Sequence, residues 1–447
     1  IDCVNARRGA EISDYAELYQ WSVEQPADFW MELAHFADVQ ADWGSGLALL
    51  DGKRMPGAKW FPDAELNFAA NLLRYRDSTE ALVFIGERSA RRALTYQQLY
   101  YEVARIAQGL RAAGVVAGDR VAGFLPNIPE AAVAMLATAS IGAIWSSCSP
   151  EFGVNGVIDR FGQIEPKVLF TADGYFYGGK TLDSLGLVAT VVSRIASIQQ
   201  VIVIPFVQSS PDLSAVESAV PSALLFERFG TSATAIDFAM LPFDQPLYIL
   251  YSSGTTGVPK CIVHGAGGTL LQHRKEHLLH TDLKRSDRLF YFTTCGWTMR
   301  NWLMSGLATG ATLVLYDGSP FFPDKNVLWR LAESEAGTSF GTSAKYLAAL
   351  EKAEAQPGPD HDLKALRTIL STGSPLLPDS YDYVYHQIKD DVLLASISGG
   401  TDIVSCFCLG NPLLPVYRGE IQCRGLGMHT AVVDDSGQAV RGEPGEL

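Results

Sequence analysis

A loop rich in hydroxyl groups and glycine carries the clearest chemical signal in the sequence. The residues Tyr251-Ser-Ser-Gly-Thr-Thr-Gly-Val-Pro-Lys260 follow an apolar run that predicts a strand. Glycines leave backbone N–H groups open to a ligand, hydroxyls add donors, and Lys260 adds a positive charge. Such a loop suits a polyphosphate, although it lacks the Gly-Lys-Ser/Thr end of a Walker A loop. The predicted phosphate-binding residues are Ser252, Ser253, Gly254, Thr255, Thr256, Gly257 and Lys260.

The loop, the three histidines at 273, 277 and 280, and His264 each allow more than one interpretation. The loop could be an ordinary Ser/Thr/Gly surface loop, but the order of its residues favours phosphate binding. His273, His277 and His280 recur at the spacing of one helical face, which could bind zinc. The residues 274–276 between them are charged, so we expect a solvated helix and no metal site there. His264 could contact substrate or nucleotide, or could be a satisfied core histidine.

Short apolar strands that alternate with helices must position these groups. Strands are predicted at 82–85, 120–125, 143–145, 167–171, 200–204, 247–251, 289–293, 312–316, 368–370 and 392–395, and helices at 94–113 and 129–140 among others. This alternation is typical of parallel sheets covered on both faces, which bind ligands at the carboxyl ends of their strands. Glycine-rich strands predicted at 420–423 and 430–433 suggest part of a small barrel. We therefore expect an α/β fold of two stacked parallel-sheet sub-units with a small distorted β-barrel.

The loop resembles the phosphate-binding motif of the AMP-forming acyl-adenylate enzymes, a family that includes acyl-CoA synthetases and luciferases. The family pattern Thr-Ser-Gly-Ser-Thr-Gly-x-Pro-Lys-Gly falls on Ser252 to Cys261, with Cys261 in place of the last glycine. Trp60-Phe-Pro, Leu94-Thr-Tyr and Gly118-Asp-Arg-Val-Ala are similar to earlier motifs of the family. The resemblance implies the fold of the large N-terminal domain of an adenylate-forming enzyme.

Two further segments carry the implied adenylate site. Gly373-Ser374-Pro375 resembles the adenine-contacting Gly-Glu-Pro turn of the family, with serine in place of glutamate. Gly400-Thr401-Asp402 resembles the segment whose threonine contacts the α-phosphate and whose carboxylate binds Mg²⁺. The resemblance therefore implies Lys260 and Thr401 as catalytic residues and Asp402 as the metal ligand.

Within this family, several segments are most similar to the acetoacetate-activating branch. They are 295–297, 301–302, 315–320, 341–347 and 398–402. Acetyl-specific relatives place tryptophan where Gly399 stands, so the resemblance implies an acyl pocket larger than acetyl, lined by Cys295, Trp297 and Gly399. Arg300 could meet the keto oxygen of the substrate or lie outside the pocket.

The implied reaction converts acetoacetate, ATP and coenzyme A to acetoacetyl-CoA, AMP and pyrophosphate through an acyl-adenylate. Phe152, Gly153 and Arg160 are candidate coenzyme A contacts. One alternative is an acyl-CoA ligase for another short or branched carboxylic acid. Another is a catalytically silent nucleotide-binding module on the same fold.

Composition limits the partners. Among 447 residues, 35 lysines and arginines face 49 aspartates and glutamates, which gives a net charge of −14. No basic stripe appears, which argues against nucleic acid. The seven cysteines form no disulfide pattern, which favours a reduced cytoplasmic protein. The longest apolar stretch, 131–145, is too short to cross a bilayer, so we expect no membrane association.

The chain is expected to consist of two parts. Residues 1–80 are predicted as an N-terminal helical extension and residues 81–447 as the AMP-binding adenylation domain. The resemblance implies a mobile C-terminal domain of the same chain beyond Leu447, which supplies a lysine for adenylation. We therefore expect the 447-residue chain to bind nucleotide but to adenylate poorly.

Overall fold

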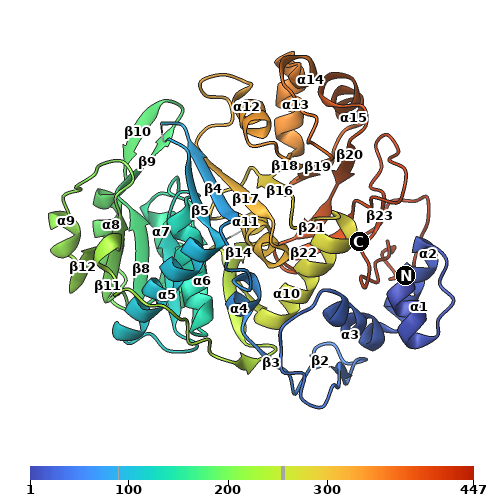
Figure 1. Ribbon diagram of the computed structural model, residues 1–447, viewed down its shortest axis with the longest axis horizontal. Helices are drawn as coiled ribbons and strands as arrows, with labels where there is room; N and C mark the ends of the chain where they lie inside the picture. Colours follow the sequence, from blue (N-terminus) through green and yellow to red (C-terminus); the bar gives the residue numbers. More distant parts are fainter. Residues whose placement is uncertain (89, 253–256) are drawn as a thin grey trace.

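Two seven-stranded sheets organise the chain, and the computed structural model describes residues 1–88, 90–252 and 257–447 (Figure 1). Neighbouring strands of the first sheet are parallel except at the β14–β15 edge, which is antiparallel. In spatial order its strands are β12 (Ser222–Leu225), β11 (Gln200–Ile204), β8 (Val168–Ala172), β6 (Arg120–Phe124), β7 (Ile144–Cys148), β14 (Pro246–Ser252) and β15 (Lys260–Gly265).

The second sheet repeats this plan, because only its β4–β5 edge is antiparallel. Its strands are, in order, β20 (Leu393–Ser396), β19 (Thr368–Thr372), β18 (Ser339–Ser343), β16 (Arg288–Tyr291), β17 (Thr312–Asp317), β4 (Glu80–Gly86) and β5 (Arg92–Thr95). A third, antiparallel sheet contains β21 (Ser398–Gly400), β22 (Ser405–Leu409) and β23 (Cys423–Arg424). The two predicted parallel-sheet sub-units are confirmed, whereas the third sheet contains only β23 from the two segments expected to form part of a small barrel.

Helices cover the large sheets and fill the space between them (Figure 1). The longer ones are α2 (Tyr15–Glu24), α3 (Pro26–Phe36), α5 (Tyr96–Ala112), α6 (Pro129–Ser140), α7 (Val154–Ile164), α8 (Leu185–Val192), α10 (Ala266–Lys275), α11 (Thr298–Ser305), α12 (Val327–Ser334) and α13 (Ala344–Lys352). The shorter ones are α1 (Asp2–Arg8), α4 (Phe68–Leu72), α9 (Ser214–Glu217), α14 (Pro357–Asp360) and α15 (Pro378–Tyr383).

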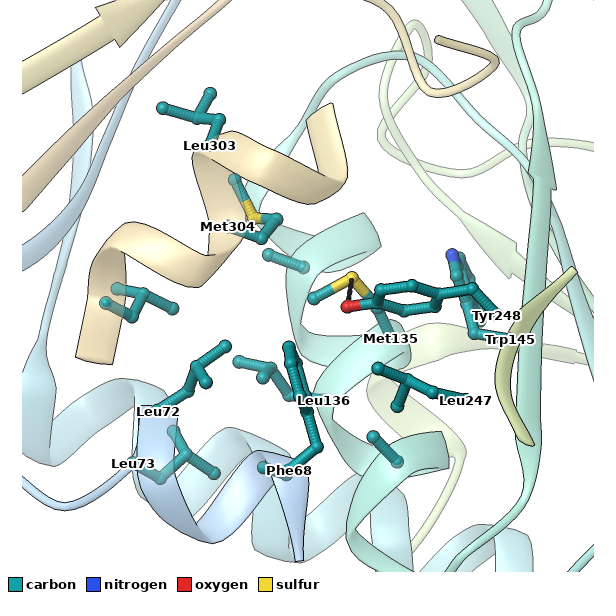
Figure 2. Packing of buried hydrophobic residues seen from close by; sticks show 14 of the residues in the cluster. Phe68, Leu72, Leu73, Met135, Leu136, Trp145, Leu247, Tyr248, Leu303 and Met304 are labelled. Carbon is teal, nitrogen blue, oxygen red and sulfur yellow. Dashed lines mark hydrogen bonds between the residues drawn. The ribbon is translucent and has the colours of Figure 1, made fainter. Parts of the chain in front are cut away.

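Helix α6 lies at the centre of the core. It packs on α4 and α5, on β6 and β7 of the first sheet, and on β4 of the second. Its alanine-rich sequence has no polar face, so almost every residue is buried, as expected for a helix that is apolar all round. Figure 2 shows Met135 and Leu136 of this helix among side chains of α4, β7, β14 and α11, with the Tyr248 hydroxyl 3.5 Å from the Met135 sulfur.

The N-terminal helices lie against the C-terminal part of the chain, close to both chain ends in Figure 1. The Tyr15 hydroxyl donates to the Arg424 carbonyl at 2.6 Å, and the Tyr19 hydroxyl donates to the Met428 carbonyl at 3.0 Å. These bonds join segments more than 400 residues apart in the sequence. The N-terminal helix α2 therefore bonds to β23 of the third sheet and to the residues that follow it.

Three predicted elements differ from the structure. The helix predicted from Leu94 begins at Tyr96. Leu94 instead lies in β5, where it pairs with Leu82 of β4, and Thr95 caps the helix with a capping box. The strand predicted at 420–423 shrinks to β23, and residues 430–433 contribute only isolated bridges at Val433 within the described chain. Strand propensity alone did not reveal that these residues lack a neighbouring strand to pair with.

Candidate active site

A cavity of about 480 Å³ opens between the second and third sheets. Its size is in the range of small-molecule sites. Seven of the residues predicted for the site line it together: Trp297, Gly373, Ser374, Pro375, Gly399, Gly400 and Thr401. They come from three segments that are far apart in the sequence, so the fold brings the predicted adenine turn, phosphate threonine and acyl wall into one place.

The Gly373-Ser-Pro turn follows the carboxyl end of β19 directly. Gly373 has φ +87°, a conformation that a side chain disfavours. A Cβ atom at this position would lie 3.8 Å from Cζ2 of Trp297, so the turn runs past the indole ring. The turn thus occupies the edge of a parallel sheet where α/β proteins bind ligands.

Thr401 follows β21 and is fixed from two sides. Its carbonyl accepts a hydrogen bond from His264 Nε2 at 2.7 Å, and its Oγ1 lies 3.0 Å from Oγ1 of Thr298. Since a carbonyl only accepts, His264 carries its proton on Nε2. Burial lowers the pKa of His264 below its usual value. This histidine on β15 therefore links the strand after the phosphate loop to the predicted α-phosphate contact.

Gly399 lies where strand β21 passes very close to β22. A Cβ atom here would lie 2.1 Å from the Ser405 carbonyl oxygen and 2.9 Å from Cα of Cys406. The backbone contact therefore excludes every side chain at this position, and the cavity wall is bare main chain. Asp402, two residues after Gly400, is exposed and lies outside the cavity lining.

The first turn of α11 forms another wall. Thr298, Met299 and Trp302 line the cavity beside Trp297, although the sequence predictions did not select them as site residues. The available signals were the position of Thr298 and Met299 directly after the Cys295-Gly-Trp297 segment and the resemblance at 301–302. Trp302 belongs to the hydrophobic core and also lines the cavity, with only 4% of its surface exposed.

Cys295 and Arg300 lie outside this wall. The predicted pocket residue Cys295 is buried, and its thiol donates to the Pro126 carbonyl at 3.3 Å. It is absent from the cavity lining, so the structure does not support it as an acyl contact. Arg300 is also buried away from the lining, where its Nε donates to Asn127 Oδ1 at 3.2 Å. Of the two alternatives for Arg300, the structure selects a position outside the pocket.

The predicted phosphate loop connects β14 and β15, whose ends are described. Ser252 and Lys260 face each other as antiparallel partners, and Lys260 is exposed. Gly257 is exposed and has φ +110°. The predicted ligands Ser253, Gly254, Thr255 and Thr256 lie outside the described residues. Their role stays a prediction.

The three histidines occupy a buried helix, so the predicted solvated helix is wrong. His273, His277 and His280 on α10 and the π-helical turn 276–280 that follows it are each at most 1% exposed. The helix passes between α3, α4 and β22, which cover its charged residues as well. Within residues 1–88, 90–252 and 257–447, no cluster of three His, Cys, Asp or Glu side chains is arranged to hold a metal ion.

The candidate coenzyme A residues form a separate cluster near the first sheet. The Arg160 guanidinium lies 4.4 Å from the ring centre of Phe152 and 5.6 Å from that of Tyr251. Arg160 also donates to the Gly156 carbonyl at 2.8 Å. The stacked guanidinium is held on the surface near the end of β14.

Comparison with known proteins identifies the fold. Residues 68–447 match the model of the AMP-binding enzyme family, and residues 15–72 match that of the acetyl-coenzyme A synthetase N-terminus. The chain belongs to the AMP-binding enzyme family. The family match spans both large sheets and the cavity between the second and third sheets, which fits the predicted adenylating fold.

Named relatives in this family are similar over nearly the whole chain. An acetoacetyl-coenzyme A synthetase of Rhizobium meliloti is 54% identical over 100% of this chain and 68% of the relative. An acetoacetyl-CoA synthetase of Gallus gallus is 47% identical over 98% of this chain and 67% of the relative. The solved structure of acetoacetyl-CoA synthetase from Streptomyces lividans superposes with a TM-score of 0.92 at 43% identity, over 98% of this chain and 68% of that one.

Within the described part of the chain, no helix has both the length and the apolar character needed to cross a bilayer.

Proposed function

We propose that this protein is an acid–thiol ligase that activates acetoacetate with ATP and transfers it to coenzyme A. In the first step a carboxylate oxygen of the acid bonds to the α-phosphorus of ATP, and pyrophosphate leaves. In the second step the sulfur of coenzyme A bonds to the acyl carbon, and AMP leaves. The observation that carries this proposal is the convergence of Gly373–Pro375, Gly399–Thr401 and Trp297 on one cavity.

The cavity residues have separate roles in this proposal. The Gly373–Pro375 turn holds the adenine, and the Thr401 hydroxyl binds the α-phosphate beside the reacting carboxylate. Fixing both reactants in one cavity lowers the entropic cost of their reaction. Lys260 and the predicted loop residues stabilise the negative charge that develops on the departing pyrophosphate.

Magnesium fits the residues at the cavity margin. Asp402 offers an exposed carboxylate next to Thr401, and Mg²⁺ in nucleotide enzymes is bound by one or two carboxylates together with phosphate oxygens. Asp402 would hold the ion, which would neutralise phosphate charge when bound. Arg160 and Phe152 are proposed as contacts of coenzyme A, where the guanidinium suits a phosphate group.

The choice of acid follows from the bare wall at Gly399. Gly399 contributes only main chain to the cavity lining, at a position where acetyl-specific relatives carry tryptophan. One methylene in a pocket changes binding by about 1–3 kcal/mol, so this wall favours an acid longer than acetate without selecting one acid. Because the relatives are named acetoacetyl-CoA synthetases, we assign acetoacetate first and another short or branched acid second.

We extend the proposal to the organisation of the protein. Residues 1–80 form an N-terminal extension and residues 81–447 the adenylation domain, and a further C-terminal domain of the same chain completes catalysis. The substrates are small molecules, and the seven free cysteines fit a reducing cytoplasmic compartment.

A panel of acids tests the function directly. The intact protein is incubated with ATP, Mg²⁺, coenzyme A and either acetate, propionate, butyrate or acetoacetate, and thioester and AMP are quantified. We expect acetoacetate to give the highest kcat/KM. A higher value for another acid would replace the assigned substrate, and thioester formation with none of them would overturn the ligase assignment.

A further inference from the structure

A buried carboxylate lies directly behind the cavity. Glu276, on the turn that continues α10, has no exposed surface. Its Oε1 accepts from the Ser405 hydroxyl at 2.5 Å and from the Cys406 backbone N–H at 3.0 Å. Its Oε2 accepts from the Trp302 indole N–H at 2.8 Å and from the Cys406 thiol at 3.4 Å. Four donors thus converge on one side chain.

The three residues that donate to Glu276 all line the cavity. Trp302 belongs to the α11 wall, whereas Ser405 and Cys406 begin β22. Strand β22 pairs in turn with β21, where Ser405 faces Gly400 and Cys406 faces Gly399. The Glu276 carboxylate therefore bonds both to Trp302 and to strand β22, which pairs with the strand that contains Gly399 and precedes Thr401.

Each contact of this side chain places a donor opposite one of its two oxygens. A carboxylate only accepts hydrogen bonds, whereas a glutamine amide would turn N–H groups toward one pair of these donors. Lys275 Nζ lies 4.0 Å from Oε1 and is itself fully buried, so a positive charge partly balances the carboxylate. The Trp302 ring also contacts His277, with ring centres 4.2 Å apart.

We propose that Glu276 is a positioning residue that sets the shape of the acyl end of the cavity and thereby the selectivity among carboxylic acids. It touches no substrate and acts through Trp302 and β22. Loss of its charge releases the indole and loosens the β21–β22 contact, so the wall no longer distinguishes acids of similar length. This inference rests on the proposed ligase function and deepens it.

The test is Glu276→Gln in the intact protein, with kcat/KM measured for acetoacetate and for butyrate. The ratio of the two values does not depend on the fraction of folded enzyme, so it separates selectivity from stability. We expect the ratio to change at least tenfold while KM for ATP stays within twofold of wild type. A ratio within twofold of wild type would overturn the inference.

Two further variants sharpen the test. Ser405→Ala removes one donor with little change of shape, so it should shift the ratio in the same direction, and its effect should largely disappear in the Glu276→Gln background. It also decides the question if Glu276→Gln does not fold, since an unchanged ratio in Ser405→Ala would then reject the inference.

His280→Gln is the matched control. His280 is buried on the same turn, but it bonds to Gly410 and Leu426 away from the cavity, so the ratio should not move.

The inference and the proposed function fail in different ways. If the wild-type protein prefers another acid, that acid replaces acetoacetate in the ratio and Glu276 is tested as before. If the wild-type protein forms no thioester with any acid of the panel, the ligase assignment fails first.

Discussion

Thr298 Oγ1 lies 3.0 Å from Thr401 Oγ1, and both residues line the same cavity. Thr298 begins α11, the proposed acyl wall, whereas Thr401 follows β21 in the third sheet. The contact therefore joins the part of the site proposed to receive the acid to the part proposed to receive the α-phosphate. These are the two groups that must meet in the first step of the proposed reaction.

Replacing Thr298 by valine keeps the volume of the side chain but removes this hydrogen bond. A typical hydrogen bond contributes about 1 kcal/mol, so we expect kcat for acyl-adenylate formation to fall about fivefold. Single-turnover adenylation with acetoacetate measures the effect. Thr298→Ser, which keeps the hydroxyl, should retain most of the wild-type rate. Equal rates for the valine and serine variants would show that the hydroxyl contact does not position Thr401.

Replacing Lys260 by alanine removes the positive charge opposite Ser252. A lost charge-assisted contact to phosphate costs about 1.5–3 kcal/mol, so kcat/KM for ATP should fall about 10- to 100-fold. Initial rates of AMP formation over a range of ATP concentrations measure this. Lys53→Ala, at another exposed lysine, should leave the rates unchanged. An unaffected Lys260→Ala enzyme would show that the phosphates bind elsewhere.

Replacing Gly399 by alanine forces a Cβ atom against the Ser405 carbonyl oxygen, 2.1 Å away. Overpacking of this kind costs about 1–3 kcal/mol, so both thermal stability and acyl-adenylate formation should decrease. Gly268→Ala is a suitable control, because no atom lies within 4 Å of its Cβ position and the residue is in helix α10. The control should be neutral or slightly stabilising. Equal melting temperatures for the two variants would contradict the close contact.

Asp317 predicts a pH-dependent change in stability. Burial, together with the charges of Glu151 and Glu87, raises its pKa to about 7, while its carboxylate accepts from the Asn127 backbone N–H at 2.8 Å. The folded state therefore holds a proton that the unfolded chain loses above its ordinary pKa of 3.8, so this residue lowers stability as the pH rises from about 4 to 7.

The variant Asp317→Asn lacks this proton exchange. It should be more stable than wild type at pH 8, and the difference should shrink steadily toward pH 4. Urea unfolding of both proteins at pH 4.5, 6 and 8 measures the trend. A difference that is constant across these pH values would show that Asp317 does not titrate as proposed.

His280 predicts that the stability of the folded protein falls as the pH is lowered. Its Nδ1–H donates to the Gly410 carbonyl, its Nε2 accepts from the Leu426 N–H, and burial lowers its pKa to about 3. Below pH 6.5 the unfolded chain binds a proton at His280 that the folded protein does not bind. The free energy of unfolding therefore falls by about 1.4 kcal/mol per pH unit as the pH decreases from 6.5 toward 3.

In His280→Gln this loss is absent. Its free energy of unfolding should therefore depend less steeply on pH than that of wild type between pH 6.5 and 4, as measured by urea unfolding. Parallel curves for the two proteins would show that His280 does not resist protonation in the folded state.

The alternating strands and helices could be predicted from local sequence because their periodicity is strong. Helix 129–140 and strand 200–204 have the predicted bounds, since proline opens the one and polar or turn residues flank the other. The buried helix around Glu276 could not be predicted, because its charged residues are typical of an exposed face and the donors to Glu276, such as Trp302 and Ser405, are distant in the sequence.

The residues of the candidate site could likewise be predicted only in part from the sequence. The segments 373–375 and 399–401 carry motifs that could be selected from sequence, and they do line one cavity. Thr298 lies outside every segment selected from sequence, and Trp302 belongs to one that was not predicted to line the site; both reach the cavity on helix α11. Cys295, two residues before Trp297, lies outside the lining, because the chain bends into α11 between them. Which neighbours of a motif face a ligand depends on tertiary packing.

The main-chain contact between Gly399 and Ser405 limits how this cavity can be redesigned. A protein engineer who wishes to narrow it for acetate cannot simply insert a large ring at position 399, since the strand behind leaves no space for its first carbon atom. Strand β22 would first have to shift, and Glu276 holds that strand in place. A change of substrate toward smaller acids therefore requires coordinated substitutions on two elements.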